Sequence, residues 1–154
     1  MSPGNVLAVA LLIGMTVLVH AGGVRSLLWL LVKHKAFYEV YHNVFVNTFR
    51  LTWVIGILIL LHLGEIVMWA LFYHWKNLFP DLETAIYYSF LTYTTVGYGD
   101  VVLPKWWRVL GASEALLGIL MTAWSTAILV GVVQRLKKAL LDRFEHPESG
   151  ATDD

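Results

Sequence analysis

Three long stretches of apolar residues divide the chain, with shorter polar segments between them. Residues 49–73 and 107–133 are each longer than the roughly 20 apolar residues that a helix needs to cross a bilayer. Residues 6–23 lie near the lower limit, but this helix lengthens if it tilts and continues through the apolar residues 27–32. The pattern therefore predicts three membrane-spanning helices.

The segment between the first two spans has a mixed pattern. Over residues 24–47, polar side chains such as Lys33 and Glu39 recur on one helical face, while Leu31 and Tyr38 recur on another. This pattern predicts an amphipathic helix at the membrane interface. A helix buried against the other spans is the alternative, because aromatic residues such as Trp29 suit either place.

The basic residues indicate which side each connection faces. Eight of the eleven Lys and Arg residues lie around the first connection or after the last span. They are Arg25, Lys33, Lys35, Arg50, Arg135, Lys137, Lys138 and Arg143. Cytoplasmic segments carry the excess of Lys and Arg in membrane proteins. We therefore expect a multi-pass protein of the cell (inner) membrane with an external amino terminus and a cytoplasmic carboxyl terminus.

The composition agrees with a protein embedded in lipid. Hydrophobic residues make up 58% of the chain, charged residues only 14%, and the mean hydropathy is +0.65. The formal net charge is zero, which gives no sign of nucleic-acid binding. Because the chain has no cysteine, disulfides and thiolate metal sites are excluded. We expect one compact membrane domain without a separate soluble domain.

A shorter helix is predicted between the second and third spans. Asp81, after Pro80, is a good N-cap, and residues 82–92 predict about three helical turns. A helix of that length cannot cross the bilayer. Non-helical backbone at membrane depth is tolerated only where it is buried in protein or faces water. The segment therefore predicts a loop that enters the membrane from outside and returns.

The residues after this helix favour a ladder of backbone carbonyls. Gly97 and Gly99 alternate with larger side chains, and glycine adopts a positive φ at little cost, which lets successive carbonyls point to one side. Four such ladders around an axis can replace the hydration shell of potassium. The expected K+ ligands are the carbonyls of Thr95, Val96, Gly97 and Tyr98, with the Thr95 hydroxyl innermost.

The run Thr94-Thr95-Val96-Gly97-Tyr98-Gly99-Asp100 resembles the signature of potassium channels, and the succession of helix, loop and helix resembles their pore domain. Residues 92–95 and 110–118 are most similar to small bacterial members identified as ion channels. The resemblance implies a prokaryotic potassium channel. It also implies a homotetramer in the lipid bilayer, because one chain carries one filter. K+ is then the permeant ion, and no cofactor is expected.

The resemblance implies an all-α membrane protein. Outer helix, pore helix, selectivity filter and inner helix would occupy residues 49–138. An extra membrane helix and the amphipathic interfacial helix would precede them in residues 1–48, and a short polar tail, expected to be disordered, would follow in residues 139–154.

Supporting residues around the filter also follow from the resemblance. Tyr87 and Tyr88 stand where the family has an aromatic pair that braces the filter tyrosine and aspartate from outside, and Thr94 adjoins the filter. Aromatic packing within a short helix is the alternative role of the tyrosines. The chain departs from the family at Leu91, where proton-gated bacterial channels have a glutamate. The inactivation chemistry of that carboxylate is therefore not carried over.

The last span contains the hinge and cavity candidates. Gly118 matches the family's hinge glycine, although close helix packing is an equal explanation for a glycine in a membrane helix. Counted helically from it, Ile119, Thr122, Thr126 and Val130 are expected to face the cavity below the filter. The threonine hydroxyls could instead bond to the backbone of their own helix.

Several ionisable residues have no role in this pattern. We place His20, His34 and His42 near the inner surface, where they could titrate or serve as polar anchors. Glu65 and Glu114 interrupt apolar spans and are expected to find partners, because a charge in the membrane is costly. We expect them to share a site behind the pore helix, where one could replace the missing acid; a packing role alone is the alternative.

Other functions remain as alternatives. A non-selective cation channel would need a broken carbonyl ladder, and a non-conducting regulatory subunit could retain the filter without using it. An enzyme is not expected, because His62 and Glu65 form no HExxH pair and no serine sits in a nucleophile elbow. No span carries arginine at every third position, so a voltage sensor is not expected. Regulation is left to the membrane, the short cytoplasmic segments, the filter or a separate regulatory partner.

Overall fold

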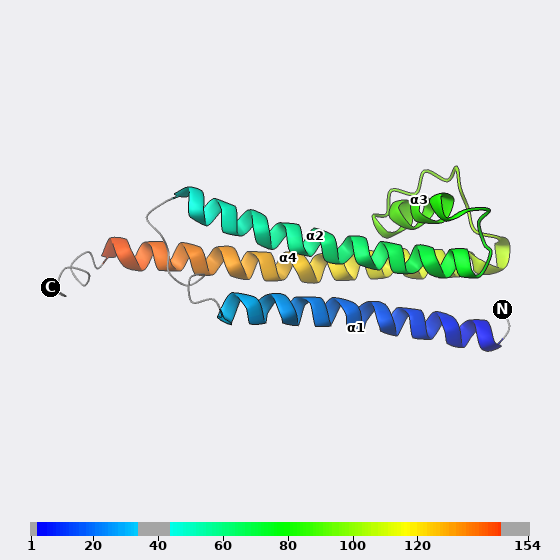
Figure 1. The fold of residues 1–154 in the computed structure, drawn as a ribbon, viewed down its shortest axis with the longest axis horizontal. Coiled ribbons are helices and arrows are strands. Elements are labelled where there is room, and N and C mark those ends of the chain that lie inside the picture. The colour runs from blue at the N-terminus through cyan, green and yellow to red at the C-terminus, as the bar shows by residue number, and fades with distance from the viewer. Residues whose placement is uncertain (1–2, 34–43, 146–154) are drawn as a thin grey trace.

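The computed structural model describes residues 3–33 and 44–145, and these form helices joined by short loops. Its elements are α1 (Pro3–Lys33), α2 (Val44–Trp75), α3 (Leu82–Tyr93), the short 3-10 helix η2 (Lys105–Trp107) and α4 (Arg108–Glu145). The three long helices lie lengthwise beside one another, and α3 lies at the same end of the bundle as the start of α1 (Figure 1). No strand occurs within the described residues.

Three helices are long and apolar enough to cross a membrane. The candidate spans are Val6–Lys33, Thr48–Trp75 and Lys105–Lys138. This confirms the three predicted spans, and the first span continues through residues 27–32 as one helix. The end of α1 and the start of α2 lie at the end of the bundle away from α3 (Figure 1).

The amphipathic segment differs from the expectation. Residues 24–33 continue α1 without a break, and α2 already begins at Val44. A separate interfacial helix over residues 24–47 is therefore wrong for these described parts, while residues 34–43 lie outside the described residues. Leu27 and Leu31 are buried and pack against Val54 and Leu58 of α2. The alternative, a helix packed against the other spans, holds for the side of α1 that carries Leu27 and Leu31, whereas the Trp29 side chain is exposed.

The last helix also extends beyond its predicted end. The polar tail was expected from residue 139, but α4 continues to Glu145. Residues 146–154 lie outside the described part. A helix can continue past its apolar stretch when the next residues, such as Leu141, have good helix propensity. The end of α4 was therefore predicted too early, because it was drawn where the apolar stretch ends.

The main core lies around α3. Trp69 and Tyr73 of α2, Phe79 of the following loop and Leu110 and Leu117 of α4 form one buried cluster. Between helices in lipid, association depends on van der Waals contact and interhelical hydrogen bonds rather than on escape from water. Large side chains from α2 and α4 therefore hold α3 in place, and α3 in turn positions the loop after it.

Candidate pore loop and the polar clusters behind it

The amino end of α3 is capped as predicted. The Asp81 side chain accepts a hydrogen bond of 2.7 Å from the Thr84 backbone N–H and one of 3.1 Å from its hydroxyl. These bonds hold the pKa of Asp81 below its ordinary value, because they favour the charged carboxylate. The cap satisfies an N–H that the first helical turn leaves unpaired.

The loop that follows α3 has an alternating backbone. Thr95, Gly97 and Gly99 have φ values of 61°, 49° and 78°, while Val96 and Tyr98 between them are not in the positive region. The positive φ predicted for the two glycines is confirmed. Thr95 was expected in the loop, but sequence reasoning did not predict its positive φ, because a threonine with positive φ is strained and only its surroundings impose it.

Hydrogen bonds tie the start of this loop to α3. The Val96 and Gly97 N–H groups donate to the Leu91 carbonyl at 2.9 and 3.2 Å, and the Thr95 N–H donates to Thr92 at 2.9 Å. The Thr94 hydroxyl donates to Phe90 at 2.7 Å. The N–H groups therefore turn back onto the last carbonyls of the helix, which leaves the carbonyls of the loop itself available for other partners.

The two tyrosines of α3 have different surroundings. Tyr87 donates a hydrogen bond of 2.6 Å to Asp100, which raises the pKa of Tyr87 and lowers that of Asp100. Tyr88 instead packs its ring against Tyr73 and Phe79, with centroids 5.3 and 4.8 Å away. Within one chain, Tyr87 contacts the end of the loop, at Asp100. Tyr88 has the alternative role, which is aromatic packing.

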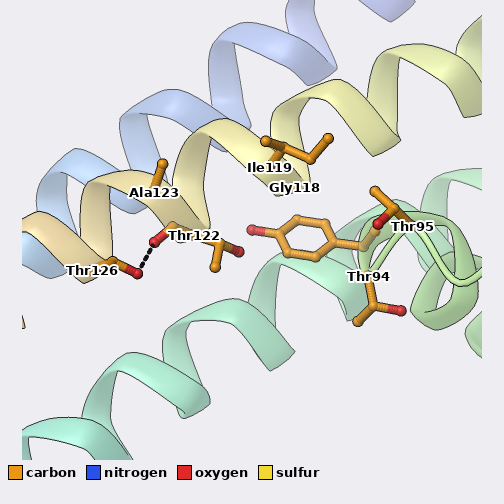
Figure 2. Close-up of a pocket in the computed structure, with 8 residues that line it drawn as sticks. Thr94, Thr95, Gly118, Ile119, Thr122, Ala123 and Thr126 are labelled. Atoms are coloured by element: carbon orange, nitrogen blue, oxygen red, sulfur yellow. Dashed lines mark hydrogen bonds between the residues drawn. The ribbon is translucent and has the colours of Figure 1, made fainter.

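A hollow of about 590 Å³ lies below the loop, between α3 and α4 (Figure 2). Its lining residues are Tyr93, Thr94, Thr95, Gly118, Ile119, Thr122, Ala123 and Thr126. The structure thus places together four of the hinge and cavity candidates. Val130 lies one turn of α4 beyond Thr126 and does not line the hollow. Its side chain is exposed. The Thr126 hydroxyl bonds to the Thr122 carbonyl at 2.8 Å, as the backbone-bonding alternative expects.

Gly118 lies where α4 comes close to the end of α3. A Cβ atom at this position would stand 2.1 Å from the Tyr93 carbonyl oxygen, which is far inside van der Waals contact. Only a residue without a side chain fits there. The structure therefore gives Gly118 a packing role, and its role as a hinge stays a prediction.

Glu114 is fully buried between three helices. Tyr73 donates to its Oε2 at 2.5 Å, and the Ser89 Oγ lies 2.5 Å from its Oε1. The same Ser89 Oγ lies 2.8 Å from the Ile66 carbonyl, which can only accept. A hydroxyl carries one proton, so both contacts are fully satisfied when Ser89 donates to Ile66 and a protonated Glu114 donates to Ser89.

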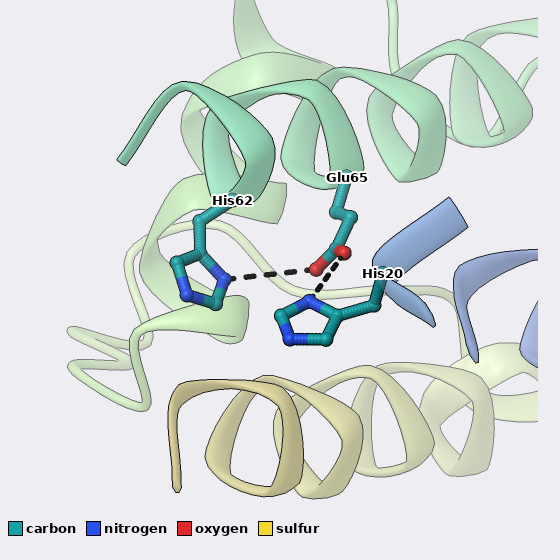
Figure 3. Close-up of side chains that lie close together, drawn as sticks. All are labelled: His20, His62 and Glu65. Carbon is teal, nitrogen blue, oxygen red and sulfur yellow. Dashed lines mark hydrogen bonds and ion pairs between the residues drawn. The ribbon is translucent and has the colours of Figure 1, made fainter. Parts of the chain in front are cut away.

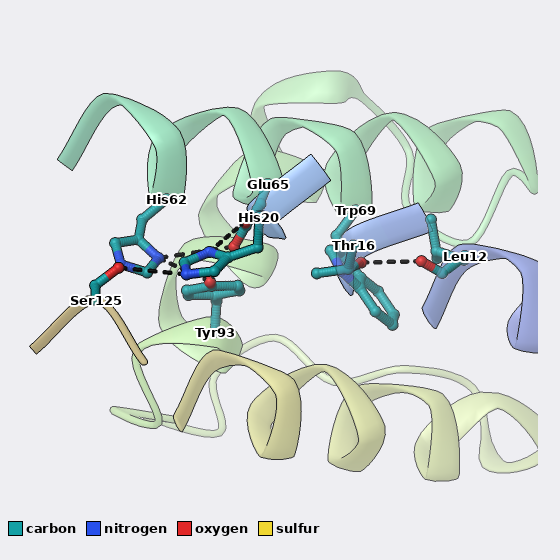
Figure 4. Close-up of polar contacts among 8 residues, drawn as sticks. All are labelled: Leu12, Thr16, His20, His62, Glu65, Trp69, Tyr93 and Ser125. Carbon is teal, nitrogen blue, oxygen red and sulfur yellow. Dashed lines mark hydrogen bonds and ion pairs between the residues drawn. The ribbon is translucent and has the colours of Figure 1, made fainter. Parts of the chain in front are cut away.

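Glu65 is buried in a second polar cluster, drawn in Figure 4. His20 of α1 lies with Nδ1 2.9 Å from Glu65 Oε1, and Tyr93 at the end of α3 donates to Oε2. His62 lies with Nδ1 2.9 Å from the Tyr93 hydroxyl and Nε2 3.1 Å from the Ser125 hydroxyl. The cluster therefore joins all four main helices directly behind the loop.

These contacts correct two expectations. His20 does not lie near the inner surface, because it is fully buried in the middle of α1; His34 and His42 lie outside the described residues. Glu65 and Glu114 both contact α3, as predicted, but they have separate partners and do not share one site. A polar residue within an apolar span signals a buried partner, yet sequence gives no means of naming it.

The comparisons with known proteins concern this same region. A family model described as an ion channel matches residues 55–135, more than half of the chain. The chain therefore belongs to the ion channel family, and with three apolar helices it is a multi-pass membrane protein. Membership points to a transport protein rather than an enzyme. No curated protein and no solved structure matches the chain. The match excludes α1 and begins within α2.

Proposed function

We propose that the chain is a subunit of a potassium-selective channel of the cell membrane, in which four copies surround one axis. The observation that carries the proposal is the alternation of φ at Thr95, Gly97 and Gly99 within the Thr-Val-Gly-Tyr-Gly-Asp sequence. When the sign of φ alternates and the first N–H groups of the loop bond to α3, the loop carbonyls can point together toward the axis of the tetramer. Such rings of carbonyls replace the hydration shell of K+.

The surroundings of the loop support this proposal. The carboxyl end of α3 borders the hollow, because Tyr93 and Thr94 line it. The carbonyl end of a helix carries partial negative charge, which favours a cation in a water-filled cavity below the loop. Thr122 and Thr126 add hydroxyl groups to that surface. In this proposal, the hollow is one quarter of a central cavity.

Exposure of the loop favours assembly with other copies. The Tyr98 side chain is 74% exposed in the single chain, and Val96 is 49% exposed. A channel with one loop per chain needs four chains to complete a ring. Neighbouring copies would then cover these side chains, and the proposal predicts a tetramer in native mass spectrometry of the purified protein. A monomer or dimer that still conducts selectively would contradict it.

Ion flux into liposomes tests selectivity. We expect the protein to pass K+ and Rb+ and to exclude Na+. Gly97→Ala and Gly99→Ala should abolish or degrade selective flux, because a side chain at a positive φ strains the loop and turns carbonyls away. Gly14→Ala is the matched control, since a Cβ there meets nothing within 4 Å and its φ is ordinary.

Each outcome separates the proposal from its alternatives. Equal Na+ and K+ flux in the wild type would identify a non-selective cation channel. Absence of flux from a correctly assembled tetramer would favour a non-conducting regulatory subunit. Normal selectivity in both filter variants would remove the basis of the proposal.

The direction of insertion is part of the same proposal. The distribution of basic residues supports an orientation with the end of α1 and the start of α2 in the cytoplasm, and with the amino terminus and α3 outside. A protease-sensitive tag at the amino terminus should be cleaved in intact cells. Protection in intact cells with cleavage after permeabilisation would overturn this orientation.

A further inference from the structure

His20, His62 and Glu65 bring three metal-binding side chains to one point between α1 and α2. Within the described part of the chain, one ligand atom from each lies within 4.8 Å of the others. Figure 3 shows both imidazole rings directed at the carboxylate, with His20 on one oxygen and His62 on the other. The distances are 2.9 Å from His20 Nδ1 to Oε1 and 3.7 Å from His62 Nδ1 to Oε2.

The chemistry of this donor set favours one class of ion. Two imidazole nitrogens and one carboxylate oxygen are a ligand set of open tetrahedral zinc sites, which keep a fourth position for another group. Ca²⁺ and Mg²⁺ prefer sites built only from oxygen. The Tyr93 hydroxyl lies 2.9 Å from His62 Nδ1 and contacts Glu65, so it adjoins two of the three side chains.

Neighbouring groups hold the ligands in place. The Ser125 hydroxyl lies 3.1 Å from His62 Nε2 and 3.4 Å from His20 Nε2, so both rings have a partner for the nitrogen that faces away from Glu65. Such outer partners fix the ring orientation and the tautomer of metal-binding histidines. The two rings lie with their centroids 5.3 Å apart.

The burial of Glu65 and His20 favours binding of a cation by the cluster. Glu65 and His20 have no exposed side-chain surface, whereas the His62 side chain is 18% exposed. Buried charges in proteins are paired or coordinate metals, because an isolated carboxylate is costly away from water. Of the three side chains, only His62 keeps exposed surface in the single chain.

We propose that His20, His62 and Glu65 bind one divalent transition-metal ion per chain, with Zn²⁺ as the ion that suits the donor set. The ion joins α1 to α2 beside Tyr93, the last residue of α3. Because α1 lies outside the region that matches the ion channel family, the site connects an additional helix to the pore-forming part. Binding of the ion does not depend on potassium selectivity.

Metal content and affinity test the proposal directly. Tag-free protein is loaded with Zn²⁺ and passed through a desalting column, and zinc is measured by mass spectrometry beside a titration calorimetry experiment. We expect one zinc per chain, unaffected by excess Ca²⁺ or Mg²⁺. His20→Asn, His62→Asn and Glu65→Gln should weaken binding by more than about 100-fold, since loss of an outer partner alone weakens metal sites by about 10- to 100-fold.

His74→Asn is the matched control, because His74 lies exposed at the carboxyl end of α2, away from the cluster, and should not contribute. Loss of a buried histidine could prevent folding, so Co²⁺ binding to the wild type provides a measurement without variants. Tetrahedral Co²⁺ gives strong visible absorption, which Zn²⁺ should abolish by competition. A wild type that binds neither ion, or a folded His20→Asn variant that binds zinc as tightly as His74→Asn, would overturn the proposal.

A flux measurement shows what the ion does. In liposomes, removing zinc with a membrane-permeant chelator should change K+ flux of the wild type and leave that of His20→Asn unchanged. Unchanged flux together with stoichiometric binding would overturn the link to the pore while keeping the site. Zinc binding in a protein without K+ selectivity would contradict only the proposed function.

Discussion

Replacing Gly118 with alanine tests the close approach of α4 to the end of α3. The added Cβ would stand 2.1 Å from the Tyr93 carbonyl oxygen and 3.0 Å from its carbonyl carbon. Carbon and oxygen atoms of neighbouring backbones ordinarily approach no closer than about 3.3 Å. The two backbones must therefore separate by roughly 1 Å, and no flexible side chain can absorb the movement.

The size of the effect follows from two opposing contributions. Inserting a methyl group into a packed core costs about 1–3 kcal/mol, and a clash between two backbones belongs at the upper end. Alanine is favoured over glycine within a helix by about 1 kcal/mol. The net loss is then about 2 kcal/mol, which lowers the midpoint of thermal unfolding by roughly 4–8 °C for a chain of this size.

Thermal unfolding of the purified protein provides the assay, with two comparison variants on the same helix. Gly131→Ala meets nothing within 4 Å and should keep or slightly raise the midpoint. Gly111→Ala would meet the Tyr88 hydroxyl at 2.2 Å, the end of a side chain, so its loss should be smaller than that of Gly118→Ala. Equal midpoints for Gly118→Ala and Gly131→Ala would refute the packing argument. If Gly118→Ala then altered only channel opening, the hinge role would be favoured.

Three further predictions concern polar contacts around α3. Asp81→Ala should lower the unfolding midpoint at neutral pH, because the Thr84 N–H loses its acceptor. In the wild type, the stabilisation by Asp81 is present above the ordinary carboxyl pKa and is lost as pH falls through the lowered pKa of Asp81. Equal midpoints of the wild type and Asp81→Ala at neutral pH would contradict the cap. Tyr87→Phe should move the Asp100 titration, followed by carboxyl NMR, to higher pH, because the hydrogen bond that lowers the pKa of Asp100 is removed; an unchanged titration would show that this bond does not form in solution. Glu114→Gln should leave the midpoint nearly unchanged, since an amide can replace a protonated carboxyl as donor and acceptor, whereas Glu114→Ala should cost at least about 2 kcal/mol through unpaired buried hydroxyls and a cavity. A large loss in Glu114→Gln would show that Glu114 is charged.

Features that depend on neighbouring residues along the chain were predictable from the sequence. Apolar stretches long enough for a bilayer identified the spans, because every backbone polar group in lipid must be satisfied within its own helix. Asp81 identified the start of α3, because a side-chain cap bonds to a backbone group three residues away. Gly97 and Gly99 indicated a positive φ, because this freedom belongs to the residue itself.

Features that depend on how the helices pack were decided only by the tertiary structure. One partner of Glu65 is His20, which lies 45 residues away on a helix whose rotation and depth no local pattern specifies. Glycine is needed at position 118 because a carbonyl of α3 lies close to it. The different surroundings of Tyr87 and Tyr88 depend on which sides of α3 are covered by α2 and α4. Hydropathy marks a residue as apolar or polar, but helices in lipid choose their contacts by shape and hydrogen bonding, and both are set between segments distant in the chain.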